Sequence, residues 1–577
     1  MMCLADDNLY ETTVEIFSDV FANYSRFVRD EDYALLYSLF QSPWGRGKYD
    51  RLVQGDYDFN SLQFGQLMLA FGDARVQHLA ENAATDPQSS QFLGQMVGLL
   101  AAEGVAIHED QIFEPALEFW STFLSALTDE AYADNAQHPP WVTAAIPYAL
   151  QVVDRCWLKI QFPPAIEFDQ WDKTDQTAFK HARGDVSDIL QQVYLLIGGR
   201  LFALFTDLLL KSVQNHDVGS QLEAAMFCLS QSPDSVGNNE QDQYLDQIFA
   251  SELLTLLTGS DSTVPLRTKQ SLFTLINHYS ATKYFRRPNG QTYLPGCLNF
   301  MVSLIDSPYL GRIAATSIYG FCGSCRTVLI PELPAFLQQY AQMSSTSNFD
   351  DQVKESFIGA VSFIIQALPD EKSKLAPLQQ LLNFVEADHD RSLQFRASAL
   401  GAIHAPSQVV TAKDYSAGLE LGLVALRCLA KVGMGLRIPD DQPIDLDKPD
   451  IISEFWTGGD GAVVQQRIIR ILTCILEAYR GEGDVVEEAC LLFRAGFTEV
   501  EPGPFVFQPA VIAEFILGFG LDAKRVGTVI KTACTFVSSY NKVTKRIDEI
   551  AAALLAWVAQ LLHQIEGKAT SRLDGIA

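Results

Sequence analysis

The chain has 577 residues, of which 48% are hydrophobic, and its 70 acidic and 42 basic residues give a formal net charge of −28. This hydrophobic fraction excludes an intrinsically disordered chain, and the negative charge disfavours direct nucleic-acid binding and contact with anionic lipid. The acidic surface either attracts basic partners or simply maintains solubility.

The cysteines and the apolar stretches indicate the cellular compartment in which the chain is expected. The ten cysteines are scattered from Cys3 to Cys534, most of them in apolar helical segments, which is typical of free thiols in a reducing compartment. The first residues lack the basic and apolar regions of a signal peptide, and polar residues interrupt the longest apolar stretches, so we expect no membrane insertion. The chain is therefore expected in the cytoplasm or the nucleus.

Helical periodicity dominates the chain, and nothing comparable supports strands. An aromatic group at helical spacing is interpreted as core and not as a binding box: Phe113, Phe119, Trp120 and Phe123. One helix is expected from Pro139 to Ile160, and one or two more from Gly184 to Val213. The prediction is an all-α fold.

Two later segments show the periodicity most clearly. The first places six apolar residues on one face of a single helix, namely Leu245, Ile248, Phe249, Leu253, Leu256 and Leu257. The second repeats the pattern over Phe357, Val361, Ile364, Ile365 and Leu368. Each series follows the 3.6-residue period of an α-helix, so each predicts an amphipathic helix with one buried face.

The helices are expected to form a regular repeat. Four of them begin near Val264, Tyr309, Asp350 and Leu393, at intervals of 45, 41 and 43 residues. HEAT and armadillo repeats are about 40–47 residues long. Prolines lie near the starts of the intervening helices, where a missing N–H costs nothing, at Pro295, Pro331, Pro334 and Pro377. We therefore predict a HEAT/armadillo-type α-solenoid of stacked antiparallel helix pairs.

Small residues and short breaks support one continuous body. Glycines such as Gly320 and Gly359 are expected to let neighbouring helices approach closely. Breaks in the pattern, such as Arg437–Asp450, are too short to be domain linkers. We predict a single superhelical solenoid over residues 1–567, in which each repeat packs on its neighbours, and a polar tail over residues 568–577.

Several segments resemble the importin-β superfamily, the karyopherins, and most closely its importin-13/transportin-3 branch in fungal form. None is diagnostic alone, and the signal is their order and spacing over roughly residues 110–520. The segments are Leu222–Leu229, Cys322–Arg326, Leu329–Leu333, Val353–Glu355, Ile364–Pro369, Leu426–Ala430 and Pro504–Phe507.

This resemblance implies a transport receptor of the nucleus and cytoplasm that binds protein cargo with basic segments on the concave surface of the solenoid. It also implies nuclear pore proteins and Ran-GTP as partners. Members of the family are usually much longer, so we expect this chain to lack the N-terminal repeats that contact Ran and the last C-terminal repeats. Ran binding by this chain is therefore left open.

One acidic loop is a candidate contact for a basic cargo or for Ran. The segment 439–450 holds five Asp and one Lys, a net charge of −4, and three prolines keep it extended. Some karyopherins use acidic inserts in this way, whereas the structural alternative is a solvated connector. The candidate residues are Asp440, Asp441, Asp445, Asp447 and Asp450.

A second candidate contact is a group of carboxylates around a tryptophan. Glu167, Asp169, Asp172 and Asp175 surround Trp171 in the sequence. An indole among carboxylates can stack on the aliphatic stem of a lysine or arginine from a partner. The alternative is that Trp171 packs into the neighbouring repeat.

No motif predicts catalysis, a metal or a cofactor. The pair Cys322 and Cys325 has no second C-x-x-C to complete a zinc site and is interpreted as two structural thiols. The nine histidines are dispersed, and the paired glycines lack the context of a nucleotide-binding loop. We therefore expect a binding protein that is not an enzyme, and the alternative to a transport receptor is a static HEAT scaffold or adaptor in a protein complex.

Overall fold

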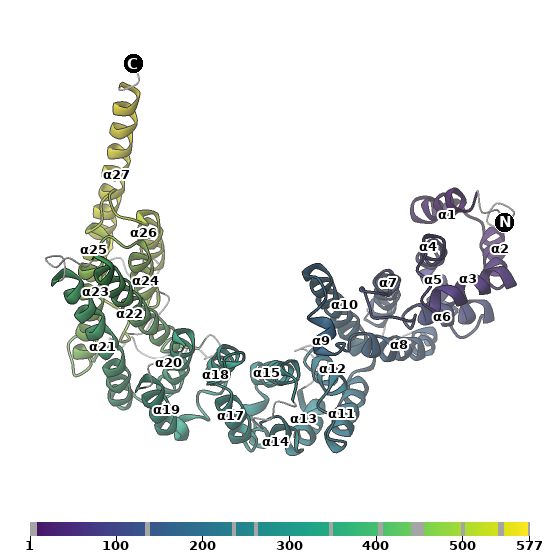
Figure 1. Ribbon diagram of the computed structural model, residues 1–577, viewed down its shortest axis with the longest axis horizontal. Helices are drawn as coiled ribbons and strands as arrows, with labels where there is room; N and C mark the ends of the chain where they lie inside the picture. The colour runs from purple at the N-terminus through teal and green to yellow at the C-terminus, as the bar shows by residue number, and fades with distance from the viewer. Residues whose placement is uncertain are drawn as a thin grey trace. The chain divides into compact units, whose positions relative to one another are not determined.

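The structure is a computed structural model (Figure 1) that describes residues 9–132, 139–232, 238–258, 264–345, 350–401, 408–439, 455–497, 502–540 and 547–574. Within these ranges the regular structure is helical, and the β structure is limited to an isolated bridge between Ala106 and Asp110. The all-α prediction is therefore confirmed. Contacts divide the chain into two compact units, Met1–Tyr284 with Thr292–Phe300 and Phe285–Gln291 with Met301–Ala577.

The first unit is a series of helices of very different lengths. They are α1 (Tyr10–Tyr24), η2 (Ser25–Phe27), α2 (Asp30–Phe40), α3 (Pro43–Val53), α4 (Phe59–Ala74), α5 (Val76–Glu81), α6 (Pro87–Leu99), α7 (Phe113–Ala131), α8 (Pro140–Lys159), α9 (Ala165–Phe168), α10 (Lys173–Ile197), α11 (Gly199–Gln214), α12 (Ser220–Leu229), α13 (Asn238–Ala250), α14 (Leu253–Thr258) and α15 (Leu266–Ala281). At the junction in the chain follow η3 (Tyr284–Arg286), α16 (Pro288–Gln291) and α17 (Leu294–Ser303).

Helix pairs build this unit in two layers. The pairs α3/α4, α6/α7, α8/α10 and α11/α12 each make direct contact, and we name the first helix of each pair an A helix and the second a B helix. B helices also contact B helices of other pairs, as α4 does with α7, α7 with α10, and α12 with α15. Each pair thus packs on its neighbours, as a solenoid requires.

The predicted helices of this unit are largely confirmed. The aromatic side chains Phe113, Phe119, Trp120 and Phe123 are all fully buried. The helix expected from Pro139 to Ile160 is α8, and the segment 184–213 contains two helices. They are separated at Gly198, whose φ of +54° is a left-handed conformation that favours glycine.

The six-residue face expected on one helix is divided between two. Helix α13 ends at Ala250 and α14 begins at Leu253. The backbone N–H of Leu253 donates to the Ser251 hydroxyl, which helps to start the new helix. The face itself is real, since Leu245, Ile248 and Leu253 are buried.

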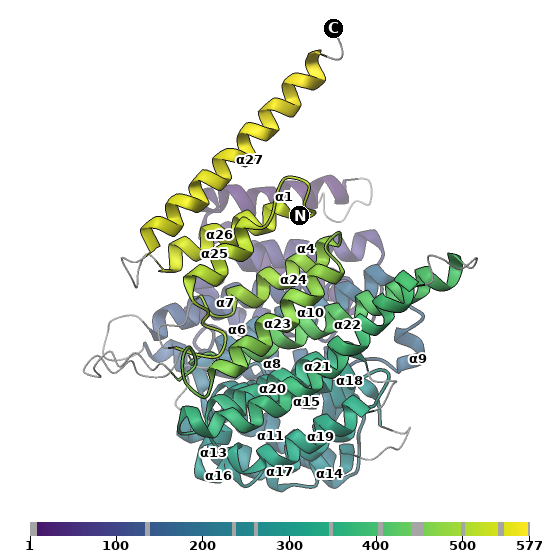
Figure 2. The same cartoon turned by 90° about the vertical axis from the view of Figure 1, so that its left-hand side faces the viewer.

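The second unit continues with longer helices. They are α18 (Gly311–Cys325), η4 (Ile330–Glu332), α19 (Leu333–Ser345), α20 (Asp351–Gln366), α21 (Glu371–Gly401), α22 (Gln408–Gly435), α23 (Ala462–Ala478), α24 (Gly483–Arg494), α25 (Pro509–Leu517), α26 (Val526–Tyr540) and α27 (Asp548–Asp574). Figure 2 shows several of them side by side.

The same two layers recur in the second unit. The pairs α19/α20, α21/α22, α23/α24 and α25/α26 are in contact, and the B helices α18, α20, α22, α24 and α26 contact one another in that order. Helix α20 begins where the sequence predicts, because the Asp350 carboxylate accepts the N–H groups of Gln352 and Val353. Its predicted face is buried at Phe357 and Val361.

The fourth expected repeat start is wrong. Leu393 lies inside α21, which runs without interruption from Glu371 to Gly401, and the next B helix begins at Gln408. Pro377 is likewise inside α21 and not in its first turn. The leucines Leu378, Leu381 and Leu382 are fully buried, so packing along this helix outweighs the loss of one backbone hydrogen bond at the proline.

Close helix approach is confirmed at one glycine and wrong at another. A Cβ on Gly359 would lie 2.6 Å from the Tyr319 ring, so α18 and α20 touch there. A Cβ on Gly320 would meet nothing within 4 Å. Spacing alone placed both in helices but did not reveal which side faces a neighbour.

The domain boundaries remain a prediction. Helix α27 runs to Asp574 and so covers most of the segment 568–577 expected as a tail.

Among the described helices, none combines the length and hydropathy needed to cross a membrane. Cys322 and Cys325 are buried free thiols, and burial raises the pKa of Cys322 well above its usual value, as expected of structural cysteines.

Candidate interaction surfaces

The predicted tryptophan contact is part of an aromatic core in the first unit. Trp171 follows α9 and is only 8% exposed. Its ring stacks on His108 with centroids 4.2 Å apart and lies 4.9 Å from the ring of Phe168. This is the packing role weighed against partner binding, and it leaves the indole little surface to offer a partner.

The carboxylates around Trp171 divide into local partners and exposed groups. Asp172 caps α10, 2.7 Å from the N–H of Thr174, and hydrogen bonds from the Asp175 and Thr174 N–H groups hold its pKa below the usual range. Asp175 lies 2.8 Å from His108 Nδ1. Glu167 is exposed, and Asp169 is exposed but pairs with Arg267 at 3.2 Å. A contact role for this group of residues remains a prediction.

The acidic loop falls mostly outside the described residues. Asp440, Asp441, Asp445, Asp447 and Asp450 all lie in the segment 440–454, which the structure does not describe. The described chain reaches Pro439 and resumes at Phe455. The predicted contact of this loop with a basic cargo or with Ran therefore remains a prediction.

Sequence analysis missed a charged cluster on three adjacent B helices of the second unit. Arg427 on α22 lies 3.6 Å from Glu355 on α20, 3.5 Å from Glu420 on its own helix, and 3.1 Å from Glu488 on α24. The three carboxylates come from segments more than 60 residues apart, so no local spacing in the sequence reveals them. We name this group the Arg427 cluster.

Burial disfavours the ionised form of two carboxylates in the Arg427 cluster. Oε1 of Glu355 is buried and accepts no hydrogen bond from the described residues. Burial raises the pKa of Glu355 to about 6, against the lowering effect of Arg427, and also raises the pKa of Glu488. One guanidinium is shared among three acids, so the cluster can accept a further cation.

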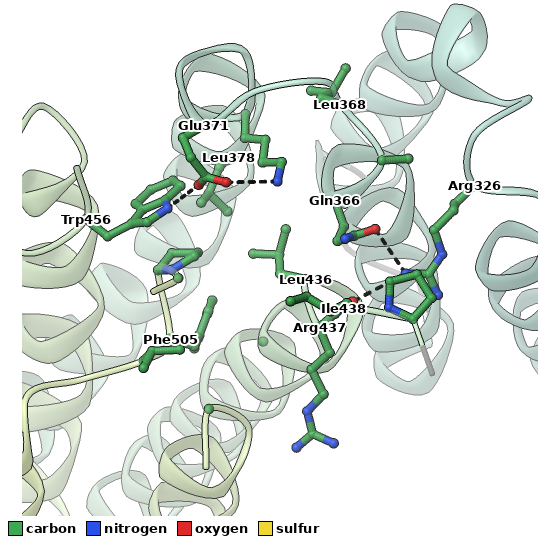
Figure 3. Close-up of a pocket in the computed structure, with 18 of the residues that line it drawn as sticks. Arg326, Gln366, Leu368, Glu371, Leu378, Leu436, Arg437, Ile438, Trp456 and Phe505 are labelled. Carbon is green, nitrogen blue, oxygen red and sulfur yellow. Dashed lines mark hydrogen bonds and ion pairs between the residues drawn. The ribbon is translucent and has the colours of Figure 1, made fainter. Parts of the chain in front are cut away.

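A cavity of about 570 Å³ lies elsewhere in the second unit (Figure 3). It is lined where four B helices end, by residues at or just after the last turns of α18, α20, α22 and α24. The start of α21 and the segment before α25 complete the wall. Figure 3 shows Glu371 and Trp456 on one side and Arg326 with Gln366 on the other.

Arginines tie the helix ends around this cavity. Arg326 donates to the Gln366 side chain at 3.1 Å and to the backbone carbonyl of Arg437 at 3.3 Å. Arg437 in turn donates to the carbonyl of Ala495 at 2.7 Å, beyond the end of α24. Cations at helix C-termini satisfy carbonyls that have no partner inside the helix. The arginines therefore position one repeat on the next.

The cavity also brings together segments that carried the family resemblance. Arg326, Leu368 and Phe505 belong to three such segments, and all three line the wall. The order of these segments in the sequence thus corresponds to one place in the fold. No group of three metal-binding side chains is found near it or anywhere else in the described part of the chain.

Comparisons with known proteins agree with this architecture. No model of a protein family matches the sequence. The chain is similar to the importin beta-like protein kap111 of Schizosaccharomyces pombe, with 23% identity over 516 residues that cover 87% of this chain and 49% of that protein. The chain therefore spans about half the length of this relative.

Solved structures show the same fold. An importin-13 structure in a cytosolic state superposes with a TM-score of 0.75 at 15% identity, over 97% of this chain and 60% of that one. Importin-β crystallised in an ammonium sulfate condition gives a TM-score of 0.53 at 13% identity, over 95% of this chain and 63% of that one. Stacked antiparallel helix pairs of this kind define a HEAT-type α-solenoid. The chain is thus similar in sequence to an importin beta-like protein and shares the fold of solved importin structures, in agreement with the predicted resemblance to the importin-β superfamily, the karyopherins.

Proposed function

We propose that this chain acts in nucleocytoplasmic transport as a receptor that binds protein cargo through basic segments. The observation that supports this best is the Arg427 cluster, in which three carboxylates on adjacent B helices share one guanidinium. With all three acids ionised, the cluster keeps a net charge of about −2. A lysine or arginine side chain of a cargo would relieve this repulsion.

The acidic positions predicted from the sequence are separate candidates for the same kind of contact. The loop 440–450, with its five Asp, and the exposed Glu167 and Asp169 supply further negative charge. Long-range attraction between such surfaces and a basic segment mainly accelerates encounter. Cargo recognition is therefore assigned to acidic groups spread over several repeats, without bond chemistry at any of them.

The remaining partners of the proposal come from the family. Nuclear pore proteins and Ran-GTP are the partners expected of a karyopherin. The expected location is the nucleus and the cytoplasm, between which such a receptor shuttles. Because the chain spans about half of its curated relative, Ran control is proposed for the longer receptors and is left open for this chain.

Nuclear uptake in permeabilised cells tests the proposal. A fluorescent reporter with a basic segment is offered with the parent chain, with Glu355→Gln/Glu420→Gln/Glu488→Gln, or with Glu477→Gln as the control. Glu477 is exposed on the A helix α23 and lies outside the Arg427 cluster. We expect nuclear accumulation with the parent and with the control, and at least a several-fold loss with the triple variant.

A static scaffold gives a different result in the same cells. A scaffold holds its partners in a fixed stoichiometric complex and does not move a reporter across the pore. Absence of uptake with the parent, together with a stable complex isolated from extract, would replace the transport proposal with the scaffold.

A further inference from the structure

Two arginines share one carboxylate on adjacent A helices of the second unit. Arg467 on α23 donates hydrogen bonds of 3.0 and 2.6 Å to the two carboxylate oxygens of Glu386 on α21, and Arg470 donates to the same carboxylate at 2.9 Å. The two helices are in direct contact. One negative charge thus faces two positive charges, which is the reverse of the Arg427 cluster. We name Glu386, Arg467 and Arg470 the Glu386 cluster.

The two arginines of the cluster are held to different degrees. Arg467 is mostly buried, with 19% of its side chain exposed, and it also donates to the Asn383 side chain at 2.7 Å. Arg470 is 63% exposed, and within the part of the chain that the structure describes it donates a single hydrogen bond, to Glu386. Arg467 is therefore fixed in place, whereas the guanidinium of Arg470 keeps N–H donors for a further acceptor.

The positive charge of the Glu386 cluster has no other balance in the described structure. Its three residues lie more than one turn inside their helices, so the partial charges at helix ends do not reach them. Asp390, one turn further along α21, lies 2.9 Å from His389 Nδ1 and forms no ion pair with either arginine. Hydrogen bonds from Arg467 and the charge of Arg470 hold the pKa of Glu386 below its usual range. The ion-paired group therefore keeps a net charge of about +1 on a chain whose formal net charge is −28.

We propose that the Glu386 cluster binds an acidic segment of a partner protein, with a carboxylate of that segment on the guanidinium of Arg470. A guanidinium can bind a carboxylate through two parallel N–H···O bonds, and Arg470 has the donors for them. Glu386 already holds both arginines side by side, so less side-chain entropy is lost when the partner binds. This surface lies on A helices and is independent of the Arg427 cluster and of basic cargo.

Two variants with opposite expected effects test the assignment. Arg470→Gln removes the exposed cation, and the fold should survive because this side chain is mostly in solvent. Glu386→Gln removes the internal carboxylate that competes for the arginines, but it keeps an acceptor oxygen and nearly the same volume. The control is Arg480→Gln, which removes the same charge from an exposed arginine beyond the end of α23 and outside the cluster. Circular dichroism checks that each variant is folded.

The measurement is fluorescence anisotropy of a labelled ten-residue peptide of alternating Glu and Ala against the full chain, with a Gln-Ala peptide as the uncharged comparison. We expect Arg470→Gln to weaken binding of the acidic peptide roughly tenfold, because a charge-assisted pair is lost. Glu386→Gln should tighten binding several-fold, and Arg480→Gln should match the parent. Raising the salt concentration should weaken binding of the acidic peptide only.

Three results would overturn the proposal. The first is equal binding of the Glu-Ala and Gln-Ala peptides by the parent chain. The second is an equal loss of binding in Arg470→Gln and Arg480→Gln, which would show an effect of net charge and not of this site. The third is a Glu386→Gln variant that binds no more tightly than the parent, because the internal carboxylate would then not occupy the place of a ligand.

Discussion

Arg183 on α10 and Glu223 on α12 form a buried ion pair in the first unit. The guanidinium binds the carboxylate through two hydrogen bonds of 3.0 and 2.8 Å, and both side chains are about 95% buried, with 6% and 5% exposed. The guanidinium also lies over the rings of Phe162 and Phe227, at 4.3 and 4.2 Å. A buried charge pair of this kind fixes how two B helices sit together more than it adds net stability.

Replacing Glu223 by Ala should therefore destabilise the first unit by about 3–5 kcal/mol, because Arg183 would be left charged and buried. The measurement is hydrogen exchange of the α10 and α12 amides. The double variant Arg183→Met/Glu223→Leu should recover most of the loss, since it removes both charges and keeps the volume. A single variant as protected as the parent would show that the pair is not buried as described.

The stability of the second unit should depend on the charge of Glu355. Burial raises its pKa to about 6, above the usual 4.5, so the native state binds a proton more tightly than the unfolded chain. Its contribution is therefore most favourable below pH 4.5 and is lost as the pH rises through 6. Glu355→Gln should stabilise the unit at pH 7 by at most about 2 kcal/mol, with no difference below pH 4.5. Urea unfolding at the two pH values checks this, and a variant less stable than the parent at pH 7 would contradict it.

At this scale the sequence predicts burial well and charge clusters badly. The burial of Phe113, Trp120 and Cys322 follows from their helical spacing and apolar neighbours. The Arg427 cluster does not, because Glu355, Arg427 and Glu488 meet only when three B helices stack. Trp171 illustrates the same limit, since acidic neighbours in the sequence do not reveal a buried ring stacked on His108.

At the scale of the helix, glycine positions determine how closely α20 and α22 pack. A Cβ on Gly435 would lie 2.6 Å from Ser362 Cβ and 2.8 Å from the carbonyl oxygen of Gly359, so Gly435→Ala should cost about 1–3 kcal/mol. Gly320→Ala on α18 is the control, because its Cβ meets open space and better helix propensity should add up to about 1 kcal/mol. Thermal unfolding followed by circular dichroism should move in opposite directions for the two variants. Similar shifts would contradict the described packing of α20 on α22.

The acidic loop is the second element with a direct test. Replacing Asp440, Asp441, Asp445 and Asp447 by Asn removes four charges with little change in volume, and a proline-rich connector contributes little to the core. If the loop contacts a basic cargo or Ran, the variant should associate more slowly and lose part of its salt dependence. Stopped-flow binding of a basic peptide measures both. A variant identical to the parent in rate and salt slope would make the loop a connector.

Helices could be predicted from the sequence where the apolar period and the N-terminal capping residue agree, and less well elsewhere. Helix α20 has both, with Asp350 as its cap and a fully buried Phe357. The helix start predicted near Leu393 is wrong because the apolar pattern of α21 passes through Pro377 and Leu393 without the break that a 43-residue repeat requires. A regular interval is an average over a solenoid, whereas the length of each helix is set by what it packs against.

At the scale of the whole molecule, two opposite charge features coexist on an acidic solenoid. The Arg427 cluster places three carboxylates around one guanidinium on the B helices, whereas arginines line the cavity at the ends of these helices. Repeats that contact only their neighbours allow both to exist without a shared core. The solenoid accounts for the arrangement of the helices, and the Arg427 cluster is the surface to which the proposed function assigns basic segments of a cargo.

The association rate of a basic peptide as a function of salt tests the central claim most directly. The parent chain is compared with Glu355→Gln/Glu420→Gln/Glu488→Gln and with Glu477→Gln. For the parent and the control, the rate should fall steeply between about 0.1 and 1 M salt, as the screening length shrinks from about 10 to about 3 Å, with a smaller change in the dissociation rate. The triple variant should associate more slowly and with a shallower salt dependence. Equal rates and equal salt slopes for all three proteins would contradict recognition of basic segments by the Arg427 cluster.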